Sequence, residues 1–175
     1  MCVYPCQGFF KESFYHMQKD ESVSNKKPRE ALKKRSASRL MAVQALYQSA
    51  FYDEPLSKTQ KDFIEEPLSS FLETESIVGD DSYFKKLLEP FVVYGLDLFD
   101  GRIREFLTKP WQFERLEVLL LSILRVGTSE LCTVQEAPKV LIINEYVTLA
   151  HGFFSQKEPA LVHAILDKVA EAAER

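Results

Sequence analysis

The sequence has few of the residues, and none of the patterns, that mark secreted, metal-binding or membrane-spanning proteins. It contains only three cysteines, Cys2, Cys6 and Cys132, which form no C-x-x-C pair and have no second cluster to complete a zinc site. Any disulfide within the chain would leave one of them over, so this usage fits a reducing compartment. There is no run of about 18 apolar residues to span a membrane, and the first residues lack the apolar stretch of a signal peptide. We therefore expect a cytoplasmic protein that makes no membrane contact.

Arrangements typical of catalysis and of metal or cofactor binding are also missing. The three histidines are scattered and have no cysteine or acid at the spacing of metal ligands. Cys132 has no adjacent histidine or oxyanion motif, which favours a buried thiol over a nucleophile. Asp97 and Asp100 lie three residues apart and could be taken for a catalytic pair, but helix capping and solvation explain them. The sequence therefore predicts a protein that is not an enzyme and binds no metal or cofactor.

The charge is distributed unevenly along the chain. The 175 residues carry a net charge of −4, yet the segment Lys26–Arg39 holds seven basic residues against the single acid Glu30. This segment is therefore at +6, and the rest of the chain is at −10. An acidic body with one basic segment concentrates anion binding at one place.

The same basic segment leads into an amphipathic pattern. Pro28 suits the first turn of a helix, and apolar residues at helical spacing predict that the helix continues to about Tyr52. Arg35 and Arg39 lie one turn apart along one edge of the apolar face. We interpret the segment as a helix held in a core at one end and offered to an anion at the other.

The remaining sequence also has helical periodicity. A helix capped by Asp81 or Ser82 should bend at Pro90 or end near Glu89. Further helices are predicted around 103–107, 113–131, and after the prolines at 138 and 159. No segment requires a strand. The sequence thus predicts an all-α compact helical bundle over residues 26–175 as a single domain, preceded by a disordered extension at 1–25.

The predicted core helix at 113–131 gives three more expectations. Gly127 within it indicates a close approach of another helix. At least one of the consecutive Leu119, Leu120 and Leu121 should face a partner or another helix. Arg125 is expected to form an ion pair between helices with Glu130 or Glu145.

Five blocks in order give the chain a family resemblance. They are AVQALYQ (42–48), SYFKKLL (82–88), WQFERLEVLLLSILRVGTSEL (111–131), APKVLIINEYVTLAHGF (137–153) and VHAILDKVA (162–170). Together they resemble the NusB family of bacterial transcription antitermination factors over roughly residues 31–171. The resemblance implies about seven helices in two packed halves. It also implies binding to the single-stranded boxA element of nascent RNA, together with the ribosomal protein NusE, in the transcription elongation complex.

The resemblance also assigns residues. Carried over to this sequence, the RNA-binding positions are Lys33, Lys34, Arg35, Arg39, Phe153 and Lys157. Without the resemblance, Phe153 would be interpreted as half of a core aromatic pair with Phe154. The resemblance also places Glu114, Arg115 and Glu117 near the surface that would bind NusE. The alternative is that they form a solvated helix turn. A homodimer is left open.

The sequence departs from the family pattern at three places. Ser36, Ala37 and Ser38 stand where several members have arginines, His163-Ala164 replaces an Asn-Gly pair, and leucines replace polar residues around 120–121. Exposed leucines there would favour a larger apolar contact. Two alternatives stay open, the first motivated by the missing arginines and His163 and the second by the resemblance itself. One is a protein-binding scaffold with weakened RNA contact, and the other is a stand-alone relative of the RNA-binding module of rRNA cytosine methyltransferases.

Overall fold

The computed structural model describes residues 26–65, 79–155 and 157–173, and these ranges contain helices and no strand. The α-helices in them are α2 (Lys26–Tyr52), α3 (Leu56–Glu65), α4 (Asp81–Tyr94), α5 (Asp97–Phe106), α6 (Val118–Ser129), α7 (Lys139–Phe153) and α8 (Lys157–Ala172). A short 3₁₀ helix, η2 (Phe113–Arg115), precedes α6, and a π-helical turn, η3 (Glu130–Val134), continues it. The all-α prediction is confirmed. The predicted extension at 1–25 lies outside the described residues.

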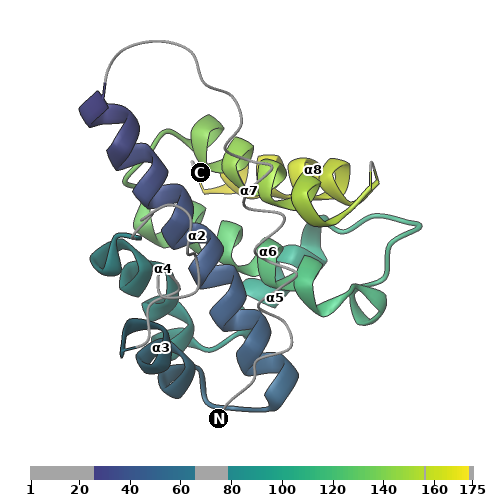
Figure 1. The fold of residues 1–175 in the computed structure, drawn as a ribbon. Coiled ribbons are helices and arrows are strands. Elements are labelled where there is room, and N and C mark those ends of the chain that lie inside the picture. The colour runs from purple at the N-terminus through teal and green to yellow at the C-terminus, as the bar shows by residue number, and fades with distance from the viewer. Residues whose placement is uncertain (1–25, 66–78, 156, 174–175) are drawn as a thin grey trace.

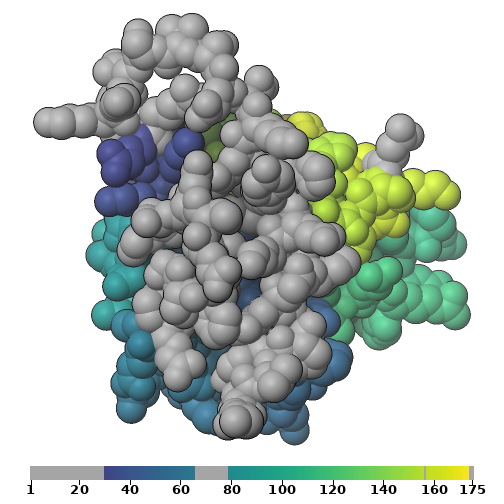
Figure 2. All heavy atoms as spheres, viewed as in Figure 1, coloured from purple at the N-terminus to yellow at the C-terminus, as the bar shows by residue number. Residues whose placement is uncertain are grey.

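The bundle is arranged around the long helix α2 (Figure 1). Helices α3 and α4 pack on one side of α2 and form one half with it, and α5 to α8 form the other half. Helix α6 joins the halves because it packs against α2 and α4 as well as against α5, α7 and α8. The first part of α2 that is coloured in Figure 2, in dark purple, lies at the molecular surface. The side chains at positions 30–35 of α2 are exposed or half-buried, whereas those at positions 37–46 are buried between the other helices.

Helices α2 and α6 supply the densest part of the core. Ala42, Val43 and Ala45 of α2 are fully buried, as the apolar periodicity requires. A Cβ atom added to Gly127 of α6 would lie 2.9 Å from Leu166 Cδ1 of α8 and 3.2 Å from Tyr146 Cδ2 of α7. The predicted close approach at Gly127 is confirmed, and a side chain at this position would require Leu166 or Tyr146 to shift.

Helix α4 differs from its predicted boundaries. Its N-cap is Asp80, whose side chain accepts a hydrogen bond from the Tyr83 N–H at 3.0 Å, not Asp81 or Ser82. The helix also continues through Pro90 to Tyr94, so of the two expected alternatives, a bend at Pro90 or an end near Glu89, the end is wrong. It ends instead at Gly95, whose φ of 76° is unfavourable for other residues and whose N–H bonds to the Phe91 carbonyl. The extra turn carries Val93 and Tyr94 to the surface.

The three consecutive leucines of α6 face helices of the same chain. Leu119 and Leu120 are buried and Leu121 is half-buried, whereas their neighbour Val118 is exposed. The idea that exposed leucines widen an apolar contact surface is therefore wrong.

Candidate nucleic-acid interface

The N-terminal half of α2 places its basic side chains in three different environments. Lys34 is exposed, Lys33 is half-buried, and the side chain of Arg35 is 34% exposed. Arg39, one turn further on, is 1% exposed. The side chains of Lys26, Lys27 and Arg29 lie outside the described residues. Over the described part of α2, the basic surface therefore consists of residues 33–35.

Arg35 is held at the surface by the chain segment that follows η3. Its Nη2 lies 3.1 Å from Glu136 Oε2, and its guanidinium lies 4.8 Å from the centre of the Tyr83 ring. The other oxygen of Glu136 accepts from Lys86 Nζ of α4 at 2.5 Å. Gln135, with a left-handed φ of 46°, turns the chain after η3 just before Glu136. One carboxylate thus bridges two cations from two helices, and the side chains involved are about one-third to one-half exposed.

Arg39 belongs to the interior. Its Nε and Nη2 donate to the Glu130 carboxylate at 2.9 and 2.7 Å, and its Nη1 donates to Glu145 at 3.2 Å. Tyr83 and Tyr146 donate their hydroxyls to the same Glu130 carboxylate at 2.5 and 2.6 Å. The side chain of Glu130 is fully buried. These contacts tie α2, α4, η3 and α7 together at one point.

The electrostatics of this cluster keep its groups in one protonation state. Burial disfavours the charged form of Arg39, but the bonded Glu130 outweighs it and raises the pKa of the guanidinium above its ordinary value. Burial, reinforced by the Glu130 charge, raises the pKa of the Tyr83 and Tyr146 hydroxyls. Both phenols therefore remain protonated donors, and the cluster contains a complete buried ion pair.

These positions bear on two predictions about the arginines. The guanidinium of Arg39 is bound to the buried Glu130 and the half-buried Glu145, which argues against the expected RNA contact. The expected partners of Arg125, Glu130 or Glu145, are wrong. Arg125 instead makes two bonds of 2.7 Å to Asp100 of α5, so Asp100 is a buried ion-pair partner and not a solvated cap.

The serines that interrupt the basic run have structural partners. Ser36 donates to Glu145 of α7 at 2.5 Å. Ser38 is fully buried, donates to the Asp80 carbonyl at 2.9 Å and accepts from the Asp80 N–H at 2.8 Å. Arginine at position 38 would have to displace the N-cap of α4. At Ser38, the interruption of the basic run therefore follows from the packing of α2 against the N-terminal end of α4.

The other predicted RNA-binding residues lie at the junction of α7 and α8. Phe153 is half-buried against the core, and Lys157 is exposed. Glu145, which meets Ser36 and Arg39, precedes Phe153 by eight residues, about 12 Å along the α7 axis.

The predicted protein-partner residues are at the surface around η2. Glu114, Arg115 and Glu117 are all exposed, and Glu114 lies 3.9 Å from Arg104 of α5. An exposed apolar group that the sequence reasoning missed lies at the end of α4 and the start of α5. It consists of Val92, Val93, Tyr94 and Leu98, each more than half exposed. The continuation of α4 through Pro90 creates this group, and the signal that could have indicated it was Gly95 as a helix stop.

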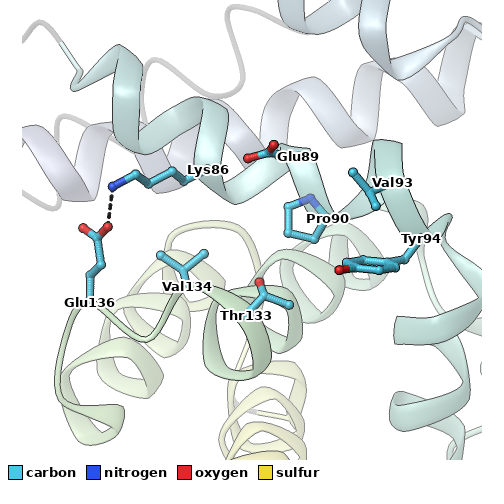
Figure 3. Close-up of a pocket in the computed structure, with 8 residues that line it drawn as sticks. All are labelled: Lys86, Glu89, Pro90, Val93, Tyr94, Thr133, Val134 and Glu136. Carbon is cyan, nitrogen blue, oxygen red and sulfur yellow. Dashed lines mark hydrogen bonds and ion pairs between the residues drawn. The ribbon is translucent and has the colours of Figure 1, made fainter.

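A pocket of about 360 Å³ adjoins the Arg35 site (Figure 3). One wall is α4 and the opposite wall is η3 with the segment that follows it. The lining residues are Lys86, Glu89, Pro90, Val93, Tyr94, Thr133, Val134 and Glu136. In Figure 3 the Lys86–Glu136 ion pair lies at one end and Tyr94 at the other.

The described residues offer neither a cluster of metal ligands nor a membrane-spanning helix. They contain no group of three or more His, Cys, Asp or Glu side chains that could hold a metal ion. Among the helices in this part of the chain, none has the length and apolar composition to cross a membrane.

Comparisons with known proteins agree with the fold. The family model described as "NusB family" matches residues 36–171. The transcription antitermination protein NusB of Allorhizobium ampelinum is 33% identical over 148 residues, which cover 85% of this chain and 92% of that protein. The protein of the same name from Novosphingobium aromaticivorans is 36% identical over 144 residues, covering 79% and 94%.

Solved structures show the same architecture. NusB of T. maritima superposes with a TM-score of 0.58 at 23% identity, covering 78% of this chain and 90% of that one. The solution structure of NusB from Aquifex aeolicus gives a TM-score of 0.60 at 23% identity, covering 79% and 88%. At this identity the likeness supports the fold.

Proposed function

The chain belongs to the NusB family of transcription antitermination proteins, a non-enzymatic family, and we propose that it binds the boxA element of nascent RNA together with ribosomal protein NusE in the transcription elongation complex. The observation that carries the proposal is the surface of α2 formed by Lys33, Lys34 and Arg35. It is the outward part of a segment at +6 on a chain whose remainder is at −10. Such a localised basic surface is the electrostatic footprint of nucleic-acid binding.

The RNA contacts are divided by chemistry. Lys33 and Lys34 supply point charges for phosphates, and Arg35 supplies a planar guanidinium that can pair with a phosphate or stack on a base. Lys157, which is exposed at the start of α8, gives a further phosphate contact, and Phe153 beside it stacks on a base. Arg39 holds α2 in place and makes no RNA contact in this proposal.

NusE is the proposed protein partner. The exposed acids Glu114 and Glu117, with Arg115 between them, would face a basic ribosomal protein, and charge complementarity mainly sets the rate and specificity of such an encounter. Replacement of both acids by lysine should weaken NusE binding and leave the binding of RNA alone unchanged. If a homodimer forms through this surface, the same replacement should weaken it as well.

The proposal is tested by fluorescence anisotropy with boxA RNA and a scrambled RNA of equal length, with and without NusE. With three to four phosphate contacts, we expect a slope of log K against log salt of about −2 to −3 on single-stranded RNA. We also expect tighter binding to boxA than to the scrambled RNA. A flat salt response would contradict RNA binding by the basic surface. Tight NusE binding with no boxA preference would favour a protein-binding scaffold instead.

A further inference from the structure

The pocket between α4 and η3 shares its charged end with the proposed RNA surface. Lys86 and Glu136 line the pocket, and Glu136 also binds Arg35 of α2. The side chain of Glu136 therefore links the pocket to the basic part of α2. This site rests on the proposed function, because it extends the same RNA surface.

The charged end is arranged to hold one anionic group with two oxygens. Arg35 Nη2 and Lys86 Nζ each bind a different oxygen of the Glu136 carboxylate, at 3.1 and 2.5 Å. A phosphodiester offers the same pattern, with two non-bridging oxygens on one centre. These ion pairs are partly exposed, and pairs of this kind contribute little to stability. A phosphate can therefore take the place of the carboxylate at little structural cost.

The other end of the pocket is apolar and aromatic. Lys86, Pro90, Val93 and Tyr94 follow each other along α4 at spacings of four, three and one residues, and the two four-residue steps from Lys86 to Pro90 to Tyr94 place these three along one side of the helix. Tyr94 is 62% exposed, and Val134 of η3 lies on the opposite wall. An exposed aromatic ring can serve as the platform on which a base of a single strand stacks. A volume of about 360 Å³ is in the range of small-ligand pockets.

We propose that this pocket takes one nucleotide of single-stranded RNA, with a phosphate between Arg35 and Lys86 in place of the Glu136 carboxylate and a base stacked on Tyr94. Lys86 and Tyr94 are thereby RNA-binding residues. Glu136 is a competing carboxylate that must turn away. Glu89, an exposed acid in the lining, repels a second phosphate and can accept a hydrogen bond from an exocyclic amino group of the base.

The first experiment separates the base contact from the phosphate contact in anisotropy titrations of the full chain with boxA RNA. Tyr94→Ala should lower the affinity about tenfold, whereas Tyr94→Phe should retain it, because stacking needs only the ring. Lys86→Gln should lower the affinity and make the salt slope about 0.7 less negative. Lys85→Gln is the matched control, since Lys85 is also exposed on α4 but does not line the pocket. It should leave the slope unchanged.

The second experiment tests the competing carboxylate. Glu136→Gln should raise the RNA affinity several-fold, and this gain should be smaller in the Lys86→Gln background, where only Arg35 remains to be released. Helical circular dichroism of each variant excludes unfolding as the cause.

The outcomes distinguish the pocket from the proposed function. If Tyr94→Ala and Lys86→Gln behave like Lys85→Gln while Lys34→Gln/Arg35→Gln weakens binding, the pocket inference is wrong and the proposed function stands. If Tyr94→Ala weakens NusE binding but not RNA binding, the pocket is part of a protein interface and the inference is again wrong. If the wild-type chain binds no RNA with or without NusE, the proposed function fails and the inference fails with it.

Discussion

Arg35 and Arg39 lie one turn apart on the same helix, yet the structure gives them opposite environments. Each lies near the ring of Tyr83, at 4.8 and 5.4 Å, and each binds a glutamate from η3 or just after it. The side chain of Arg39 is 2% exposed and that of Arg35 is 34% exposed. One arginine thus serves the interior and the other faces solvent.

The difference shows that exposure, more than residue type, decides what an ion pair does. The Arg39–Glu130 pair is fully bonded and buried, so it specifies how four segments pack. The Arg35–Glu136 pair is open to water, so a ligand can exchange with either partner. RNA binding is assigned to the open pair for this reason.

The largest expected effect is on the closed pair. Arg39→Ala leaves the Glu130 carboxylate buried without its cation, which should lower the free energy of unfolding by about 3–5 kcal/mol. Urea denaturation followed by circular dichroism measures it. Arg39→Ala/Glu130→Gln is the control, and removal of the buried charge should recover part of the loss. A loss of less than about 1 kcal/mol for Arg39→Ala would contradict the structural role.

The sequence could not distinguish these two arginines. Helical periodicity placed both at the edge of the apolar face of α2, and this was right about the helix and its core side. Which arginine is buried depends on Glu130 and Glu136, which lie 91 and 101 residues away along the chain. No local pattern predicts such a pairing.

The same limit explains the other differences from prediction. Arg125 was expected to pair with Glu130 or Glu145, but the bundle brings Asp100 to it from α5. In contrast, the all-α class, the extent of α2 and the close approach at Gly127 depend on local periodicity and size, and these were predicted correctly. The pocket was missed because its two walls come from α4 and η3, which the sequence separates.

The next expected effect is on the open surface. Lys34→Gln/Arg35→Gln should lower boxA affinity about a hundredfold, two contacts at about 1.4 kcal/mol each. Thermal unfolding should be nearly unchanged, because both side chains are exposed or half-exposed. Anisotropy and circular dichroism on the same samples give both quantities. Loss of stability without loss of RNA affinity would mean that Arg35, like Arg39, serves the packing of the helices and not RNA binding.

Tyr83 lies beside both arginines, with its hydroxyl in the buried cluster of Arg39 and its ring next to Arg35. Tyr83→Phe removes the hydroxyl that donates to buried Glu130 and should cost about 1–2 kcal/mol of stability. It retains the ring beneath Arg35, so RNA affinity should not change. Urea denaturation measures the change in stability, and anisotropy measures the RNA affinity. A fall in RNA affinity per folded molecule would show that the closed cluster also acts on the open surface.

The buried tyrosines also predict a pH dependence. Burial and Glu130 raise the pKa of Tyr83 and Tyr146 in the folded chain. The folded state therefore holds these protons more tightly than the unfolded state. Their contribution to stability should be complete below about pH 10, the ordinary tyrosine pKa, and should be lost as pH rises above it. Stability measured from pH 8 upward should fall less steeply in Tyr83→Phe than in the wild type.

The smallest expected effect concerns the strength of the open pair itself. A double-mutant cycle of Arg35→Gln and Glu136→Gln should give a coupling energy of about 0.3–1 kcal/mol at low salt, because both side chains are about one-third exposed. At 1 M salt, where the Debye length is about 3 Å, this coupling should approach zero. The coupling between Arg39 and Glu130 should persist under the same conditions, since water and ions do not reach it. Equal salt sensitivity of the two pairs would mean that Arg39 is as accessible as Arg35, and Arg39 would then have to be considered again as an RNA contact.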